Sequence, residues 1–146
     1  MKDELRTRVR IDLGDGTSPI AMVDDEEIDH ELVKRFHKRS GIANPLIHFL
    51  EGAAFIAHLE TVKSGAAPLP ALVLMDINMP RMDGFETIET MRRDEFFRRL
   101  PVVMMLTSSS DVRDRERASM AGADDYLLKS YNPKAYQDFF ASLAEA

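Results

Sequence analysis

The sequence predicts an α/β protein in which five parallel strands form a doubly wound sheet. Five short apolar segments alternate with five segments whose apolar residues recur at helical spacing. Several of the apolar segments are continuous runs, which is the pattern expected when helices cover both faces of a parallel sheet. A chain of 146 residues suits one domain with a substantial core.

The expected strands are short and mainly apolar. In chain order they read PIAMV, PLIHFL, ALVLM, PVVMML and DDYLL, at residues 19–23, 45–50, 71–75, 101–106 and 124–128. The expected helices lie between these strands and after the last one, at residues 26–41, 51–65, 85–99, 110–122 and 133–146.

Apolar spacing, stop residues and start residues justify each helix in turn. The first three each carry four apolar residues on one face: Ile28, Leu32, Val33 and Phe36, then Ala54, Phe55, Leu59 and Val62, then Phe85, Ile88, Met91 and Phe96. Gly41 is a suitable stop for the first helix. The fourth helix is weakly apolar, and the fifth opens with Pro133, a favourable first-turn residue.

Composition excludes several classes of protein. Hydrophobic residues make up 45% and charged residues 30%, which indicates a soluble globule, and the net charge of −6 argues against broad nucleic-acid binding. The chain has no cysteine, which excludes disulfides, thiolate nucleophiles and cysteine-based metal sites. It has no apolar run of the roughly 18 residues that a membrane span needs, and no signal-peptide core. We therefore expect a cytoplasmic protein with no membrane or nucleic-acid partner.

Polar side chains follow four of the five expected strands. They are Asp24 and Asp25 after the first, Asp76 after the third, Thr107 after the fourth and Lys129 after the fifth. The alternating elements favour the flavodoxin-like strand order 2-1-3-4-5, in which ligands bind beyond the carboxyl ends of the strands, beside the first and third. We therefore expect these side chains to share one site.

The residue types at this site point to phosphoryl transfer. Three carboxylates repel one another unless a cation joins them, and Mg²⁺ prefers oxygen ligands, commonly one or two carboxylates with a phosphate. Asp24, Asp25 and Asp76 can supply that set. A carboxylate in line with a metal-bound phosphate is a competent nucleophile. The phosphoryl group also needs a hydroxyl donor and a cation, which Thr107 and Lys129 would provide.

Each feature also has a structural explanation when it is taken alone. Asp24 and Asp25 could start a helix, and Asp76 could form a turn. Thr107 could belong to a capping run, and Lys129 could lie in solvent. None of these explanations places all of the groups at the same end of successive strands, so the joint pattern favours a site.

From residue 19 to the C-terminus the chain resembles the receiver domain of two-component response regulators. The matching stretches are VDDE at 23–26, LVLMDINMPRMDG at 72–84, PVVMMLTS at 101–108 and AGADDYLLKS at 121–130. The resemblance implies that Asp76 accepts a phosphoryl group from a histidine kinase. It further implies that Mg²⁺ is bound by Asp24, Asp25, Asp76 and the backbone carbonyl of Asn78. Thr107 and Lys129 would contact the phosphoryl group, and Tyr126 would be the switch partner of Thr107.

A switch of this kind makes physical sense. A new phosphate brings about −1.5 to −2 charge and strong acceptor oxygens. Thr107 can move to donate to it, and Tyr126 can turn inward to fill the vacated space. The face made by the fourth helix, the fifth strand and the fifth helix then changes, which biases partner binding. The alternative for Tyr126 is an ordinary half-buried strand aromatic.

The chain departs from the family pattern in two places. The family usually has proline directly after the lysine, commonly with a cis bond, whereas this chain has Ser130. A cis bond there would cost about 2.5–4 kcal/mol, so we expect a trans bond with a reshaped loop, or a strained bond. Residues 1–18 form an extension before a receiver domain at 19–146. Their RTRVRID stretch, at 6–12, suits a disordered tail, a mobile arm or an added edge strand.

The resemblance also bears on partners. The long second helix, the AAPLP connector at 66–70 and the stretch at 94–106 are similar to those of small stand-alone regulators that serve phytochrome-type histidine kinases. Such relatives often form homodimers, which implies a dimer through the face of the fourth helix, fifth strand and fifth helix. Because the chain ends soon after its fifth helix, we expect output through a downstream protein or a phosphorelay.

Other functions fit parts of the sequence. A pseudo-receiver would bind proteins without phosphotransfer, and Ser130 is the feature that favours it. A haloacid-dehalogenase-like phosphatase also uses a strand-end aspartate and Mg²⁺, but such sequences place a second aspartate where this chain has Asn78. A flavin module would fit the fold alone, although DDEEIDH would repel its phosphate. We therefore expect a signalling receiver that is not classified as an enzyme.

The four histidines predict no zinc site. His30, His37, His48 and His58 fall on different expected elements or faces, which favours surface or interface roles.

Overall fold

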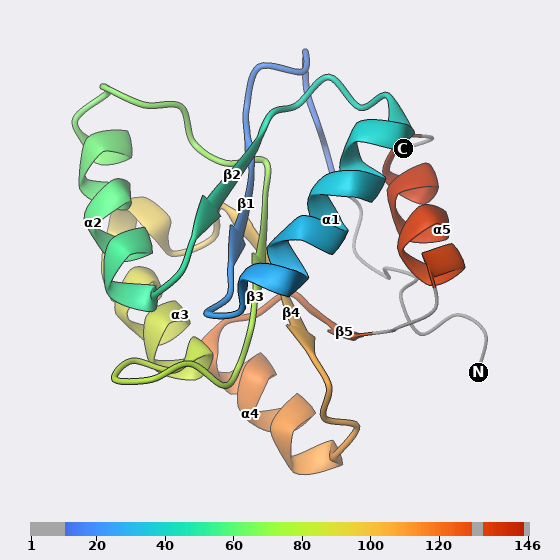
Figure 1. Ribbon diagram of the computed structural model, residues 1–146. Helices are drawn as coiled ribbons and strands as arrows, with labels where there is room; N and C mark the ends of the chain where they lie inside the picture. Colours follow the sequence, from blue (N-terminus) through green and yellow to red (C-terminus); the bar gives the residue numbers. More distant parts are fainter. Residues whose placement is uncertain (1–10, 130–132, 145–146) are drawn as a thin grey trace.

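The computed structural model describes residues 11–129 and 133–144. The helices and strands alternate along the chain. In order they are β1 (Ile20–Val23), α1 (Glu27–Ser40), β2 (Leu46–Phe49), α2 (Gly52–Lys63), β3 (Leu72–Met75), α3 (Gly84–Arg93), the short 3-10 helix η1 (Glu95–Phe97), β4 (Val102–Thr107), α4 (Val112–Ala121), β5 (Asp125–Leu128) and α5 (Pro133–Ala144). The strands form one parallel sheet in the order β2-β1-β3-β4-β5 (Figure 1). The predicted fold class and strand order are confirmed.

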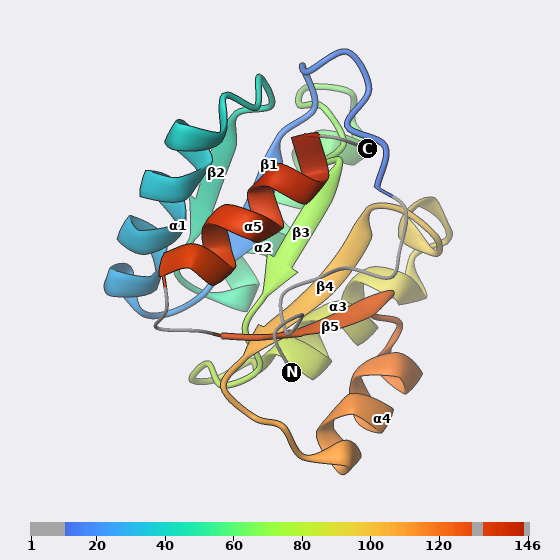
Figure 2. The ribbon, with the colours of Figure 1, turned by 90° about the vertical axis from the view of Figure 1, so that its right-hand side faces the viewer.

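The sheet lies between two layers of helices. Helices α1 and α5 lie side by side on one face, and α2, α3 and α4 cover the other (Figure 2). No helix in the described part of the chain combines the length and apolarity that a membrane crossing requires.

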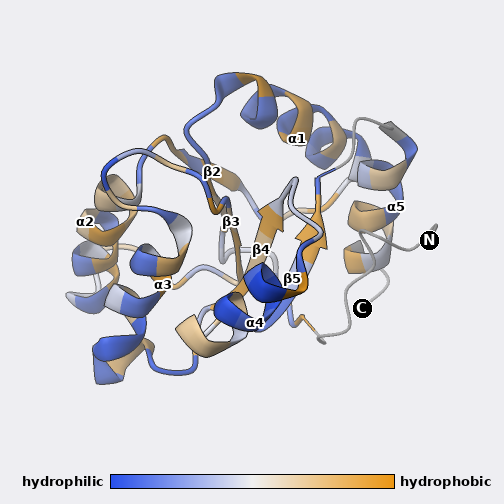
Figure 3. Ribbon diagram, turned by 90° about the horizontal axis from the view of Figure 1, so that it is seen from below, coloured by the Kyte–Doolittle hydropathy of each residue, from blue (hydrophilic) through white to orange (hydrophobic). Residues whose placement is uncertain are grey.

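Alternating strand residues separate the core into two parts. In β1, Ile20 and Met22 join the core under α1 and α5, whereas Ala21 and Val23 join the core under α2, α3 and α4. Both faces of the central strands are therefore buried, which explains why β1 and β3 read as continuous apolar runs. In Figure 3 the hydrophobic colour is concentrated in the strands, and α4 is largely hydrophilic.

The described part of the N-terminal extension packs against the domain. Ile11 is buried in the core under α1 and α5. The side-chain amide of Asn44 donates to the carbonyl oxygens of Leu13 (2.9 Å) and Ser18 (2.8 Å) and so holds the segment before β1. The RTRVRID stretch lies outside the described residues except for its last two positions.

The third helix is shorter than predicted, and Phe96 does not lie on its buried face. Helix α3 stops at Arg93, and the side chain of Asp94 accepts a hydrogen bond from the Phe96 amide at the start of η1. This cap interrupts the helical phase, so Phe97 is buried while Phe96 is 53% exposed.

Two apolar positions predicted on buried helix faces are exposed. The buried face of α1 carries His30, Val33 and Phe36, and Ile28 lies outside it at 74% exposure. On α2 the buried face carries Phe55, Leu59 and Val62, whereas Ala54 faces solvent. In both helices, packing against the sheet selects a slightly different stripe from the one that apolar spacing suggested.

A close approach at Gly84 connects the fold to the predicted site. The Gly84 amide donates to the carbonyl oxygen of Ile77 (2.8 Å), and a Cβ at Gly84 would overlap the carbonyl oxygen of Asp76. This backbone contact closes the loop between Asp76 and α3, so α3 can begin directly against the end of β3.

We predict that Gly84→Ala lowers the free energy of unfolding by about 1–3 kcal/mol, because the added methyl group must displace backbone. Urea denaturation measures the loss. Ala57→Ser, which adds one heavy atom at an exposed position of α2, should cost no more than about 0.5 kcal/mol. Equal losses in the two variants would contradict the steric explanation.

Candidate functional site

Parallel pairing brings the predicted site residues to one edge of the sheet. Val23 and Met75 lie opposite each other, so Asp24 and Asp76 leave the sheet together. Two backbone hydrogen bonds extend the ladders into the site, from the Asp76 amide to Val23 (2.9 Å) and from the Lys129 amide to Thr107 (2.7 Å). The predicted convergence of these strand ends is therefore observed.

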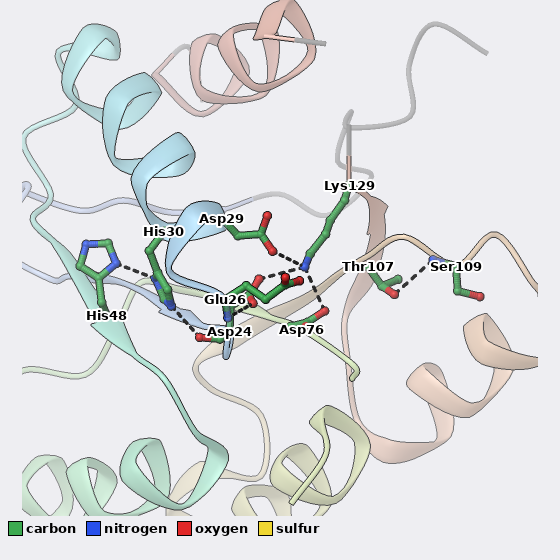
Figure 4. A network of polar contacts seen from close by, with 9 residues as sticks. All are labelled: Asp24, Glu26, Asp29, His30, His48, Asp76, Thr107, Ser109 and Lys129. Carbon is green, nitrogen blue, oxygen red and sulfur yellow. Dashed lines mark hydrogen bonds and ion pairs between the residues drawn. The ribbon is translucent and has the colours of Figure 1, made fainter. Parts of the chain in front are cut away.

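The ammonium group of Lys129 is the centre of the site (Figure 4). Its Nζ lies 2.6 Å from Asp29 Oδ2, 3.0 Å from Asp24 Oδ2 and 3.3 Å from Asp76 Oδ1. Side-chain exposure is 13% for Lys129, 15% for Asp29 and 6% or less for the other two. One buried positive charge is thus shared by three carboxylates.

Asp29 is a member of this cluster that our sequence analysis missed. It lies in the first turn of α1, where an acid is ordinary because it complements the helix dipole. The sequence signal was a further acid five residues after Asp24, which reads as part of the acidic helix start. Only the tertiary fold brings the first turn of α1 to Lys129, which follows β5.

The acidic groups could hold a divalent cation. Carboxylate oxygens of Asp24, Asp25 and Asp76 lie within 4.8 Å of one another. Asp24 Oδ1 accepts a hydrogen bond from the Glu26 amide (2.9 Å), whereas the buried Oδ2 accepts none and lies 3.0 Å from the Lys129 ammonium as an ion pair. A buried, charged oxygen without a hydrogen bond suits a hard cation such as Mg²⁺.

Burial makes the two central carboxylates unusually hard to ionise. Desolvation, followed by the charge of Asp76, raises the pKa of Asp24 to about 7. Desolvation likewise raises the pKa of Asp76 to about 6, against the opposing effect of Lys129. Desolvation alone would lower the pKa of Lys129, but the hydrogen bond to Asp29 and the charges of Asp76 and Asp24 raise it. Near neutral pH, bound protons therefore neutralise part of the negative charge in the metal-free site.

Thr107 and Tyr126 are connected through Ser109. The Thr107 hydroxyl is fully buried and accepts a hydrogen bond from the Ser109 amide (3.3 Å), while the Tyr126 hydroxyl donates to the Ser109 carbonyl (2.6 Å). The Ser109 hydroxyl donates to Asp114 in α4 (2.6 Å), and the Arg115 guanidinium lies over the Tyr126 ring. A displacement of Thr107 would therefore alter the hydrogen bonds of Tyr126 and α4 through the short loop that contains Ser109.

Two of the four histidines are not the separate surface groups that we predicted. His30 of α1 is buried, with Nε2 2.7 Å from the carbonyl oxygen of Asp24 and Nδ1 2.8 Å from Nδ1 of His48 in β2 (Figure 4). If His30 donates from Nε2 to this carbonyl, its Nδ1 can accept a hydrogen bond from Nδ1 of His48. The pair thus secures the backbone at the end of β1.

Comparison with known proteins supports this arrangement. A family model described as the response regulator receiver domain matches residues 20–139. The chain belongs to the response regulator receiver family. As a receiver domain it is similar to the probable methanogenesis regulatory protein FilR2 of Methanothrix harundinacea, with 31% identity over 126 residues, which cover 86% of this chain and 79% of FilR2.

Two further relatives have solved structures. Response regulator Rcp1 of Synechocystis is 33% identical over 116 residues, which cover 79% of this chain and 78% of Rcp1. Its Mn²⁺-bound crystal structure superposes with a TM-score of 0.74 over 88% of this chain and 92% of that one, at 29% identity. RPA3017, a response regulator in red light signalling of R. palustris, gives a TM-score of 0.75 at 31% identity over 86% of this chain and 90% of its own.

The remaining predicted positions have different outcomes. Asn78 is an exposed residue of the loop after β3, and ligation by its carbonyl stays a prediction. Ser130 lies outside the described residues, as does the bond that joins it to Lys129.

We predict that the metal-free receiver loses stability as pH rises from about 4 to about 7. Asp24 and Asp76 have higher pKa values in the native state than an aspartate in an unfolded chain, so the native state binds more protons than the unfolded chain in this range, and the free energy of unfolding falls. Asp24→Asn should therefore raise the free energy of unfolding by about 1–3 kcal/mol near pH 7.5, and by less near pH 5.

Urea denaturation with a chelator present at both pH values measures this effect. Asp25→Asn removes an exposed carboxylate from the next position and should give a smaller gain. An effect of Asp24→Asn that is equal at the two pH values would show that ionisation of Asp24 is not the cause.

Proposed function

We propose that this chain is a phosphorylatable receiver that accepts a phosphoryl group from a histidine kinase on Asp76, with Mg²⁺, and signals through a partner-binding face. The observation that carries the proposal is the position of the Asp76 carboxylate. It lies at the end of β3, 3.3 Å from the Lys129 ammonium and beside the acids that fit a cation. The proposed residues are those that the sequence predicts: Asp76 as acceptor, Asp24, Asp25, Asp76 and Asn78 for the metal, and Thr107 and Lys129 at the phosphoryl group.

The side chains of the site can carry the transfer. A carboxylate oxygen of ionised Asp76 forms the new P–O bond while the P–N bond to the kinase histidine breaks, and its electron pair stays on the imidazole nitrogen. Bound Mg²⁺ would neutralise charge on the phosphoryl oxygens. Lys129, whose ammonium lies 3.3 Å from Asp76, and Thr107, the last residue of β4, would contact the same oxygens. A pKa of about 6 leaves Asp76 mostly ionised at neutral pH.

Output would pass through the face made by α4, β5 and α5. Tyr126 lies in β5, and its hydroxyl contacts the loop that leads from Thr107 into α4. Helix α4 exposes Val112 (66%) and Met120 (89%), which suit a protein partner. We propose a downstream protein or phosphotransfer partner for this face, and a homodimer through the same face as a further state.

The kinase we propose is of the phytochrome type. The support is the 31% identity with RPA3017, whose description places it in red light signalling. A cytoplasmic location fits a receiver that meets its kinase there. The chain would act as a signalling module and not as a classified enzyme, with no nucleic-acid or membrane partner.

We predict that incubation with acetyl phosphate and Mg²⁺ adds one phosphoryl mass to the wild-type protein and none to Asp76→Ala. The reason is that Asp76 supplies the only oxygen that forms the new bond in this mechanism. Intact mass spectrometry measures the gain, and a chelator should abolish it. Asp138→Ala, at an exposed position of α5, should behave as the wild type. Absence of any gain in the wild type would instead favour a pseudo-receiver.

We predict that Tyr126→Phe separates phosphorylation from output. The variant loses the hydrogen bond to the Ser109 carbonyl but leaves the Asp76 site intact, so its phosphorylation rate should stay within about threefold of wild type. The phosphorylation-dependent changes in amide chemical shifts of α4 and β5 should be smaller. Shift changes as large as those of the wild type would contradict a switch role for this hydroxyl.

A further inference from the structure

The contacts of Lys129 differ in strength. The contact with Asp29 is the shortest, at 2.6 Å, and is a hydrogen bond from Nζ to Oδ2. Asp24 and Asp76 lie farther away, at 3.0 and 3.3 Å, and Asp24 Oδ2 accepts no hydrogen bond. The Asp29 carboxylate therefore contributes most to fixing the position of the Lys129 ammonium.

The three acids also differ in what else they must do. In the proposed function, Asp24 binds the metal, and Asp76 binds the metal and becomes esterified. When Asp24 and Asp76 take these roles, their carboxylates attract the Lys129 ammonium less strongly. Asp29 is neither the acceptor nor part of the cluster of Asp24, Asp25 and Asp76, so it can hold the ammonium before and after transfer.

The location of Asp29 suits a fixed anchor. It lies in the first turn of α1, whose next turns pack Val33 and Phe36 into the core. The Asp29 amide donates to the Glu26 carbonyl (3.1 Å), which fixes the backbone at the start of the helix. Its side chain is 15% exposed, so the hydrogen bond to Lys129 is largely shielded from water.

We propose that Asp29 is the positioning residue of Lys129, which holds the ammonium beside Asp76 while Asp24 and Asp76 are engaged with the metal and the phosphoryl group. The inference rests on the proposed function of the same site. Asp29 acts through Lys129 and touches neither the phosphoryl group nor the reacting atoms. Removing it would take away the shortest hydrogen bond of the ammonium, which could then leave the position beside Asp76 in which it meets the phosphoryl oxygens.

A competing role for Asp29 comes from the acids themselves. Carboxylate oxygens of Asp24, Glu26 and Asp29 also lie within 4.8 Å of one another, so Asp29 could contribute to cation binding. The two roles separate in the kinetics. A positioning role changes the rate at saturating Mg²⁺, whereas a role in cation binding changes the Mg²⁺ concentration needed for half the maximal rate.

The test is the rate of phosphorylation by acetyl phosphate as a function of Mg²⁺ concentration, in wild type, Asp29→Asn, Lys129→Met and the double variant. We expect Asp29→Asn to lower the rate at saturating Mg²⁺ roughly tenfold. The half-saturating Mg²⁺ concentration should change by less than about threefold. In the Lys129→Met background, Asp29→Asn should have no further effect, because the residue that it positions is gone.

Glu27→Gln is the matched control, since it removes the same charge from an exposed side chain in the same helical turn. Its rate should stay within about twofold of wild type, because an exposed charge is screened. Three results would overturn the inference: an unchanged rate in Asp29→Asn, an equal loss in the presence and absence of Lys129, or a loss confined to Mg²⁺ affinity.

A second measurement does not depend on phosphorylation. A buried, hydrogen-bonded ammonium exchanges its protons slowly, so the ¹H–¹⁵N signal of Lys129 Nζ should be visible in the metal-free wild type and in Glu27→Gln, and lost or strongly shifted in Asp29→Asn. An unaltered signal in Asp29→Asn would refute the anchor whatever the phosphorylation result. Failure of the wild type to gain a phosphoryl group would refute the proposed function. The Lys129 Nζ signal would then test by itself whether Asp29 holds the ammonium.

Discussion

The ion-pair cluster around Lys129 determines what the rest of the site can do. One ammonium faces three carboxylates that are at least 85% buried, and the isolated charges would be costly in such surroundings. The ammonium offsets part of that cost, but desolvation still raises the pKa values of Asp24 and Asp76, with the charge of Asp76 as a further cause for Asp24.

The sheet makes this cluster possible. Both faces of β1 and β3 are packed with apolar side chains up to the last residue of each strand, and parallel pairing makes the strands end together. The close approach of Gly84 to the Asp76 carbonyl then brings the start of α3 against the end of β3 and closes the loop between them. These strands thus present groups that would repel one another on a flexible chain.

The same edge of the sheet also connects the site to the surface. Ser109 accepts from Tyr126, donates its amide proton to Thr107 and its hydroxyl proton to Asp114. These bonds run from the buried end of β4 to β5 and α4 within a few residues. On the opposite side of the site, His30 and His48 connect the backbone of Asp24 to the edge strand β2. A structural change at the strand ends can therefore be transmitted by hydrogen bonds to β5 and α4 on one side and to β2 on the other.

The sequence by itself determined the five strands, their order and the positions of Asp24, Asp25, Asp76, Thr107 and Lys129. These signals are local, because an apolar run that ends in a polar residue marks both a buried strand and its exit from the sheet. Tertiary structure alone decided the burial of Phe97 in place of Phe96, the pairing of His30 with His48 and the role of Asp29. Each of these depends on the phase of a helix or on a contact between distant segments. Asp29 and Lys129 are 100 residues apart in the chain, and no local pattern specifies that the first turn of α1 meets the end of β5.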